Sequence, residues 1–148
     1  MGKNWKLHHV TAVVRDIDKT IKYYQSLGIA TFEPEFLLNG SDCDYKVNGK
    51  TPDPMVKLRI RFVQIGSLRL ELVQPVEGVS AHKDFLNSGG DGIYFIAFSV
   101  DDLDKETDKL VKKGMKVILS GKTQTVSFAG FDTGKVGNVC VELVQQLK

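Results

Sequence analysis

Three ionisable side chains lie in apolar segments that are typical of β-strands. His9 begins a run of apolar and β-branched residues, Glu71 lies in Leu-Glu-Leu-Val-Gln at 70–74, and Glu142 lies in Val-Glu-Leu-Val-Gln at 141–145. Imidazole and carboxylate groups are the side chains that transfer protons or bind metals in many proteins. These three residues are therefore the candidates for a site, provided that the fold brings their strands together.

An internal repeat relates these segments to one another. His9 begins a 20-residue pattern, an apolar run followed by aspartates and a helical segment ending at glycine, which recurs from Phe95 at an offset of 86. The two Glu-Leu-Val-Gln segments recur at an offset of 71, so the first copy has 15 additional residues. Matched positions of two packed modules are expected to face each other. Glu71 is then matched by Glu142, whereas His9 is matched by Phe95.

Length and composition point to one folding unit. The chain has 148 residues, 42% of them hydrophobic, and a formal net charge of +2 with its basic residues scattered along the sequence. Scattered charge of this kind does not indicate nucleic-acid binding. The N-terminal residues contain no apolar signal region, and no segment approaches the length of a membrane span, so a cytoplasmic protein is expected. Cys43 and Cys140 lack metal-ligand spacing and are expected to be reduced thiols.

Periodicity predicts the same order of elements in each copy. In the first, a strand at 7–14 precedes a helix from 17 to Gly28, a strand at 29–38, a polar loop at 39–54 and a hairpin of strands 56–65 and 68–74. A turn of helix is expected at 80–86. The second copy has a strand at 92–100, a helix at 102–113 and strands near 115–119, 123–129 and 137–145. Asp16-Ile17-Asp18 and Asp101-Asp102 are expected to form the N-terminal caps of the two longer helices, where negative charge is favoured.

The fold class is therefore α+β, with two tandem βαβββ modules that form a cupped mixed sheet. Residues 1–148 are expected to make a single domain, with modules at about 5–76 and 91–148 and a linker at about 77–90. One helix per module covers one sheet face, so the other faces form a cup suited to a small ligand. The loop at 39–54 is expected at the rim, where it would influence substrate choice.

Strand alternation predicts which side chains enter the cup. Successive residues of a strand face opposite sides. Arg69 and Glu71 then face away from the helix-side leucines of the same strand, Glu142 faces away from Val141 and Leu143, and His9 faces away from His8. His9, Glu71 and Glu142 are predicted to converge. His8 and His82 are interpreted as surface or helix-side residues without a role.

The chain resembles the vicinal oxygen chelate superfamily, which includes glyoxalase I, methylmalonyl-CoA epimerase, extradiol dioxygenases and fosfomycin-resistance proteins. The resemblance lies in His-His-Val-Thr-Ala-Val-Val-Arg-Asp-Ile-Asp at 8–18, Leu-Glu-Leu-Val-Gln-Pro at 70–75, residues 92–102 and Val-Glu-Leu at 141–143. It implies a divalent metal held by His9, Glu71, residue 95 and Glu142. Phe95 occupies the third of these positions and cannot bind a metal, which argues against the dioxygenase and thiol-transfer activities because both need the second histidine.

The resemblance implies proton transfer by enolisation of a small carbonyl or thioester substrate, as in an epimerase, isomerase or lyase of the glyoxalase type. Zinc, nickel, cobalt or manganese would be held by His9, Glu71 and Glu142, with affinity reduced or lost because Phe95 replaces an imidazole. Glu71 and Glu142 would also move the proton, and Phe95, Arg69 and Thr11 would contact the substrate. A homodimer is expected by the same resemblance. The alternative is a metal-free protein of this fold that binds a small molecule, as sequestering resistance proteins do.

Overall fold

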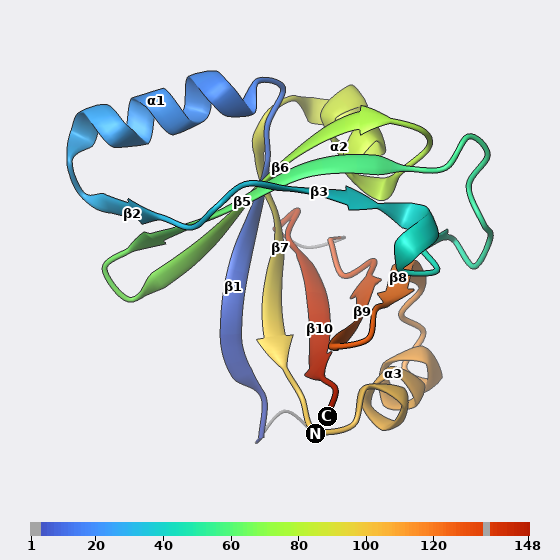
Figure 1. Ribbon diagram of the computed structural model, residues 1–148. Coiled ribbons are helices and arrows are strands. Elements are labelled where there is room, and N and C mark those ends of the chain that lie inside the picture. The colour runs from blue at the N-terminus through green and yellow to red at the C-terminus, as the bar shows by residue number, and fades with distance from the viewer. Residues whose placement is uncertain (1–3, 135–136) are drawn as a thin grey trace.

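A computed structural model describes residues 4–134 and 137–148. In the described residues the elements, in chain order, are β1 (Lys6–Val13), α1 (Ile17–Leu27), β2 (Ala30–Phe32), β3 (Phe36–Asn39), the 3₁₀ helix η1 (Gly40–Asp42), β4 (Lys46–Val47), β5 (Lys57–Ile65), β6 (Leu68–Glu77), α2 (Ala81–Gly89), β7 (Gly92–Ser99), α3 (Leu103–Lys112), β8 (Val117–Lys122), β9 (Val126–Phe131) and β10 (Cys140–Gln146). All the strands belong to one mixed sheet that curves strongly (Figure 1). The predicted α+β class and cupped sheet are confirmed.

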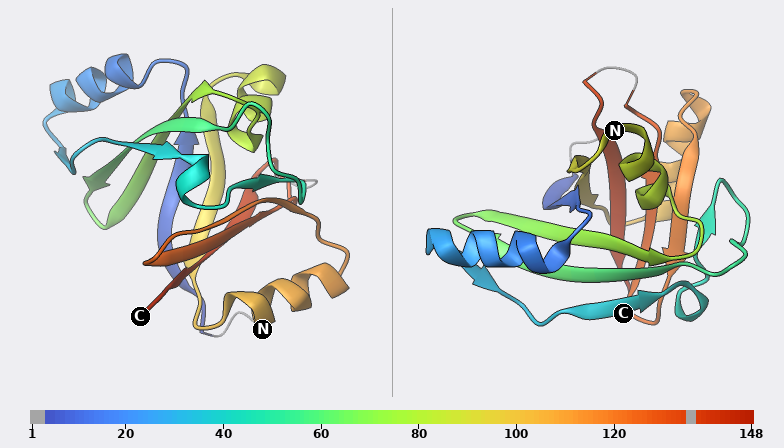
Figure 2. Two further views of the ribbon diagram at one scale, coloured as in Figure 1. Left: turned by 45° about the vertical axis from the view of Figure 1, so that its right-hand side comes forward. Right: turned by 90° about the horizontal axis from the view of Figure 1, so that it is seen from above.

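Both halves of the sheet have the same strand order. The two halves meet where β1 pairs with β7 in antiparallel fashion. Outward from this junction, the first half runs β1-β6-β5-β2 and the second runs β7-β10-β9-β8. In each half the first strand pairs in parallel with the last, β1 with β6 and β7 with β10. The strands of the two halves run in different directions, as the view from above shows (Figure 2). The sequence repeat is thus reproduced as a repeat of strand topology.

The two longer helices begin in the same way and cover the outer faces of their halves. Asp16 and Asp102 each accept a hydrogen bond from the third backbone N–H of the helix that follows. The side-chain oxygens of Gln74 and Gln145 accept the first N–H of the same helices, each at 2.9 Å. Helix N-termini leave N–H groups without partners, and these four side chains satisfy them. Both predicted caps are confirmed, and the repeated Gln positions have the same structural task.

Helix α2 and the segment after β3 fill one end of the concave face. A buried cluster joins Tyr45 and Val47 of that segment to Ala81 of α2 and to Phe95 and Leu119 of the second half. Tyr45 is 1% exposed and Phe95 is fully buried. The concave face therefore has a packed end and an open end.

The segment 29–54 differs most from its prediction. The prediction of a single strand at 29–38 is wrong, because the segment forms two strands, β2 and β3, which both pair with β5. Pro34 lies in the break between them, since it lacks the N–H that a ladder hydrogen bond needs. The region 39–54 is also not a plain polar loop. It contains η1 and β4, and β4 pairs with β8 of the other half. The inserted segment therefore connects the two halves of the sheet at the packed end of the concave face.

Several smaller points complete the fold. Strand β7 begins at Gly92 as predicted, and the other three strands of the second half begin two or three residues later than predicted. Cys43 and Cys140 are buried and free, as expected. Residues 1–3, which are part of the N-terminal segment interpreted as lacking a signal region, lie outside the described residues. In the described ranges, no helix has the length and apolar character needed to cross a membrane.

Candidate functional site

Strand register brings the three predicted site residues together at the junction of the two halves. His9 on β1 and Glu142 on β10 both lie opposite Ala97 of the intervening strand β7. One step along, Thr11 of β1 lies between Glu71 of β6 and Phe95 of β7. The two rows are related by the repeat, which exchanges Glu71 with Glu142 and His9 with Phe95. Because Ala97 has a small side chain, His9 and Glu142 reach each other across it.

The imidazole of His9 lies between the two carboxylates. Its Nε2 atom is 3.7 Å from Glu71 Oε1 and 3.4 Å from Glu142 Oε1. His9 is 4% exposed and Glu142 8% exposed. Among the described residues, Nε2 of His9 has no hydrogen-bond partner. A buried polar atom without a partner costs free energy and is a common sign of a group kept for a ligand or for a reaction.

The polar atoms around this centre hold it in one arrangement. The Thr11 hydroxyl donates a hydrogen bond to Glu71 Oε1 at 2.9 Å. The Nδ1 atoms of His8 and His9 are 2.8 Å apart, so one of the two rings carries the proton between them. His9 therefore presents Nε2, and not Nδ1, to the carboxylates.

Burial and mutual charge change the proton affinities of the centre. Burial lowers the pKa of His9, but the negative charges of Glu71 and Glu142 outweigh it and the pKa is raised. Burial raises the pKa of Glu71, and the neighbouring charge of Glu142 adds to that effect. Both shifts have one cause: two carboxylates share a space with little solvent and too little positive charge. The centre therefore retains protons or takes up a cation.

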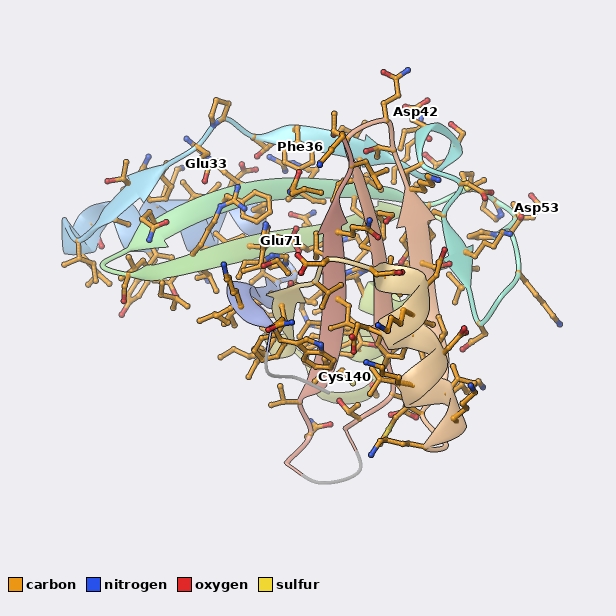
Figure 3. All side chains as sticks on the ribbon, turned by 90° about the horizontal axis from the view of Figure 1, so that it is seen from below. Glu33, Phe36, Asp42, Asp53, Glu71 and Cys140 are labelled. Carbon is orange, nitrogen blue, oxygen red and sulfur yellow. The ribbon has the colours of Figure 1, made fainter. Side chains whose placement is uncertain are left out.

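A cavity of about 460 Å³ opens onto the centre. Its walls carry Phe36 and Phe62 from the first half and Phe128 from the second, with aliphatic side chains between them. Glu71 on β6 and Phe36 on β3 are separated only by strand β5 (Figure 3). The cavity has the size of a small-molecule site, with an apolar body and one polar end.

Several cavity residues were not found from the sequence. His8 was predicted to be a surface or helix-side residue, which is wrong: it lines the cavity, and its Nδ1 atom is 2.8 Å from that of His9. His82 was predicted to be a surface or helix-side residue, which is wrong: it lies on α2, is 5% exposed and lines the cavity. Burial lowers its pKa to about 4 despite the nearby charge of Glu142. Tyr45, from the inserted segment, places its hydroxyl 3.5 Å from His82 Nδ1 and also lines the cavity. Helical spacing offered one signal, because His82 and Leu86 lie one turn apart and Leu86 is also buried.

The three residues predicted to contact a substrate lie in different environments. Arg69 lines the cavity; Glu33 accepts two hydrogen bonds from its guanidinium at 3.2 Å each, and the guanidinium lies 3.8 Å from the ring centre of Phe62. Thr11 and Phe95 are fully buried, and in the described part of the chain they lie outside the cavity lining.

Phe95 lies beneath α2 and fills space left by a glycine. Its ring centre is 6.1 Å from that of His82. A Cβ atom on Gly130 would lie only 2.9 Å from the Phe95 ring, so this glycine allows the close approach. Phe95 is thus a core residue that supports the imidazole of His82.

The chemistry of the donor set fits a divalent cation. Adjacent ligands on a cation with bonds of about 2.1 Å are about 3 Å apart, and the distances from His9 Nε2 to the two carboxylates are slightly longer. Across residues 4–134 and 137–148, no group of three or more His, Cys, Asp or Glu side chains has the placement needed to hold a metal ion. One nitrogen without a partner and two carboxylates short of positive charge are nevertheless the groups that such a cation would engage.

A sequence profile of the glyoxalase/bleomycin resistance protein/dioxygenase superfamily matches residues 8–134. The chain belongs to this superfamily. The matched range contains His9 and Glu71 and ends before Glu142, whose strand the fold places beside them. No curated protein sequence matches the chain significantly.

Several solved structures share the fold. Methylmalonyl-CoA epimerase from Mycobacterium tuberculosis is 22% identical with a TM-score of 0.70, over 96% of this chain and 88% of that one. A Streptomyces coelicolor methylmalonyl-CoA epimerase variant in complex with 2-nitronate-propionyl-CoA is 18% identical with a TM-score of 0.66, over 97% and 98%. A 4-hydroxymandelate synthase variant from Streptomyces coelicolor is 15% identical with a TM-score of 0.65, and this chain, 99% covered, spans 50% of its length. At these identities the likeness concerns the fold.

Proposed function

We propose that this protein is an enzyme that moves a proton at a carbon atom next to a carbonyl group, with a divalent cation held by His9, Glu71 and Glu142. The observation that carries the proposal is the unpartnered Nε2 of His9, held between two buried carboxylates at the end of a cavity. The similarity of the fold to methylmalonyl-CoA epimerases supports the reaction class.

When bound, the cation would polarise the substrate carbonyl and acidify the adjacent C–H bond. The chain itself supplies the groups that move the proton. Glu71 and Glu142 come from opposite halves of the sheet, so one removes a proton from one side of the substrate carbon and the other returns it to the opposite side. The raised pKa of Glu71, caused first by burial, suits it to carry the proton that is returned.

His9 and Thr11 position these groups. The Nδ1 contact with His8 fixes the orientation of the His9 ring, and the hydroxyl of Thr11 holds Oε1 of Glu71. The apolar walls of the cavity exclude water from the charged centre, which strengthens each electrostatic interaction within it.

Metal titration tests the proposal directly. Protein treated with EDTA and dialysed should bind one equivalent of Ni²⁺, Co²⁺ or Mn²⁺ by calorimetry, and His9→Ala should abolish binding. His82→Ala is the matched control, because it removes another buried histidine that lies outside the three-residue set. In D₂O, the Co²⁺-loaded protein should accelerate deuterium uptake at the hydroxymethyl carbon of 2-hydroxyacetophenone, and Glu142→Gln should remove this acceleration. Absence of binding by all three metals would rule out the proposed cation site.

A second function is favoured by the apolar character of the cavity. Phe36, Phe62 and Phe128 make walls suited to an aromatic molecule, so we also consider a metal-free protein that binds and sequesters such a compound. Tight binding of an aromatic ligand, without metal uptake and without deuterium exchange, would identify this second function.

A further inference from the structure

Among the described residues, the polar end of the cavity has no lysine or arginine charge free for an anionic ligand. Arg69 is the only Lys or Arg among the described residues that line the cavity. Both of its hydrogen bonds to a carboxylate go to Glu33, and its guanidinium covers Phe62. The positive charge of Arg69 is therefore balanced by the carboxylate of Glu33.

The two carboxylates of the centre act against an anion as well. Glu71 and Glu142 share a buried space with a single histidine between them. A divalent cation at this place would have its charge balanced by the same two carboxylates, so an anionic substrate would meet no net positive charge in either state. A negatively charged group beside them would be repelled.

The remaining polar groups of the cavity wall are uncharged hydrogen-bond partners. Burial raises the pKa of the Tyr45 hydroxyl above its usual value, so it stays protonated. Burial holds the pKa of His82 at about 4, so its ring is neutral near pH 7. If the Tyr45 hydroxyl donates to Nδ1 of His82, the proton of the neutral ring is on Nε2, which is then a donor. Neutral donors suit an uncharged oxygen such as a ketone or hydroxyl.

The rest of the lining is apolar and aromatic, apart from His8, Thr123, Thr125 and Gln146. Phe36 and Phe62 stack with ring centres 6.4 Å apart on the wall of the first half, and Phe128 lies on the wall of the second. Aromatic rings on both walls favour a flat, apolar ligand between them.

We propose that the cavity selects an uncharged carbonyl compound with an aromatic or apolar body, its oxygen hydrogen-bonded by the imidazole of His82 that Tyr45 orients, and rejects carboxylates. The choice of a carbonyl compound rests on the proposed function. The preference for an uncharged ligand is a property of binding and is measurable without turnover.

Two probes of similar size separate charge from shape. 2-Hydroxyacetophenone and benzoylformate have the same phenyl ketone, but only benzoylformate carries a carboxylate. Calorimetric titration of the EDTA-treated protein should give a dissociation constant at least tenfold lower for 2-hydroxyacetophenone. Glu142→Gln should reduce this ratio because it removes one repelling charge, and Glu77→Gln, the same change at an exposed position outside the cavity, should leave the ratio unchanged.

Tyrosine variants test the hydrogen bond. Tyr45→Phe, which removes the hydrogen bond that orients His82, should weaken 2-hydroxyacetophenone binding about 2- to 10-fold, the range expected for one hydrogen bond. Tyr23→Phe, at a position 62% exposed on α1, should have no effect. Equal or tighter binding of benzoylformate, no measurable binding of the ketone, or unchanged affinity in Tyr45→Phe would overturn the assignment. Because chelator is present throughout, failure of the metal-dependent reaction would show separately, in the metal titration and the deuterium exchange.

Discussion

The protonation of His82 makes the stability of the fold depend on pH in a direction that the structure fixes. In the folded chain its pKa is about 4, against 6.5 for an unperturbed histidine, because burial removes the charged ring from water. As the pH falls below 6.5, the unfolded chain binds a proton at His82 before the folded chain does. The stabilisation from a neutral His82 is therefore present above the unfolded pKa and is lost as the pH falls toward the folded pKa.

The size of the effect follows from the two pKa values. A difference of about 2.5 units corresponds to roughly 3 kcal/mol in total, of which about 2 kcal/mol is lost between pH 7 and pH 5. Urea denaturation of the wild type and of His82→Gln at these two pH values isolates the contribution. The wild type should lose about 2 kcal/mol more than the variant on acidification.

The comparison with the variant is needed because other groups titrate in the same range. The pKa of His9 is raised by Glu71 and Glu142 against the effect of burial, so its contribution has the opposite sign, and it is present in both proteins. Equal loss of stability in wild type and His82→Gln would show that the ring of His82 is solvated or charged in the fold. It would also remove His82 as a neutral donor in the cavity.

Three further predictions concern the packing of Phe95, the ion site and the N-terminal cap of α3. Phe95→Ala should lower the free energy of unfolding by about 3–5 kcal/mol in urea denaturation, since the ring is fully buried, whereas Phe36→Ala at a 45% exposed position should cost less than about 1 kcal/mol; equal costs would contradict the core role of Phe95. Ala97→Leu should weaken Co²⁺ binding at least tenfold in calorimetry because the larger side chain separates His9 from Glu142, and unchanged affinity would show that the two do not bind one ion. Gln145→Ala should cost about 1 kcal/mol of thermal stability through the lost cap of α3, and no change would mean that water replaces the amide oxygen.

The sequence predicted the fold class and the convergence of the three site residues because both depend on local, periodic information. Strand alternation decides which side of a strand a residue faces, and an internal repeat adds which strands correspond. Glu71 and Glu142 each lie between apolar residues, and His9 begins an apolar run, so their common face was readable from 7–14, 70–74 and 141–145.

The sequence failed where a contact joins distant segments. Tyr45 lies in a stretch rich in Gly, Asp and Asn, which is typical of a solvated loop, yet β4 pairs with β8 and draws Tyr45 into the core. His82 lies in a short linking helix, and nothing in the sequence of that helix predicts which side chains it contacts. Pairing across the cup is a tertiary event, and no local pattern in either segment encodes it.

By itself, the sequence determined the superfamily resemblance, the repeated topology and the single-histidine centre with two carboxylates. Only the tertiary structure decided whether Phe95, which the repeat matches with His9, lines the cavity or packs in the core. The space there is closed by α2 and by the close approach to Gly130, so the ring became part of the core, and His82 lies between it and the cavity. The physical reason is that burial at one position depends on side chains that are far apart in the chain and meet only when the sheet curves.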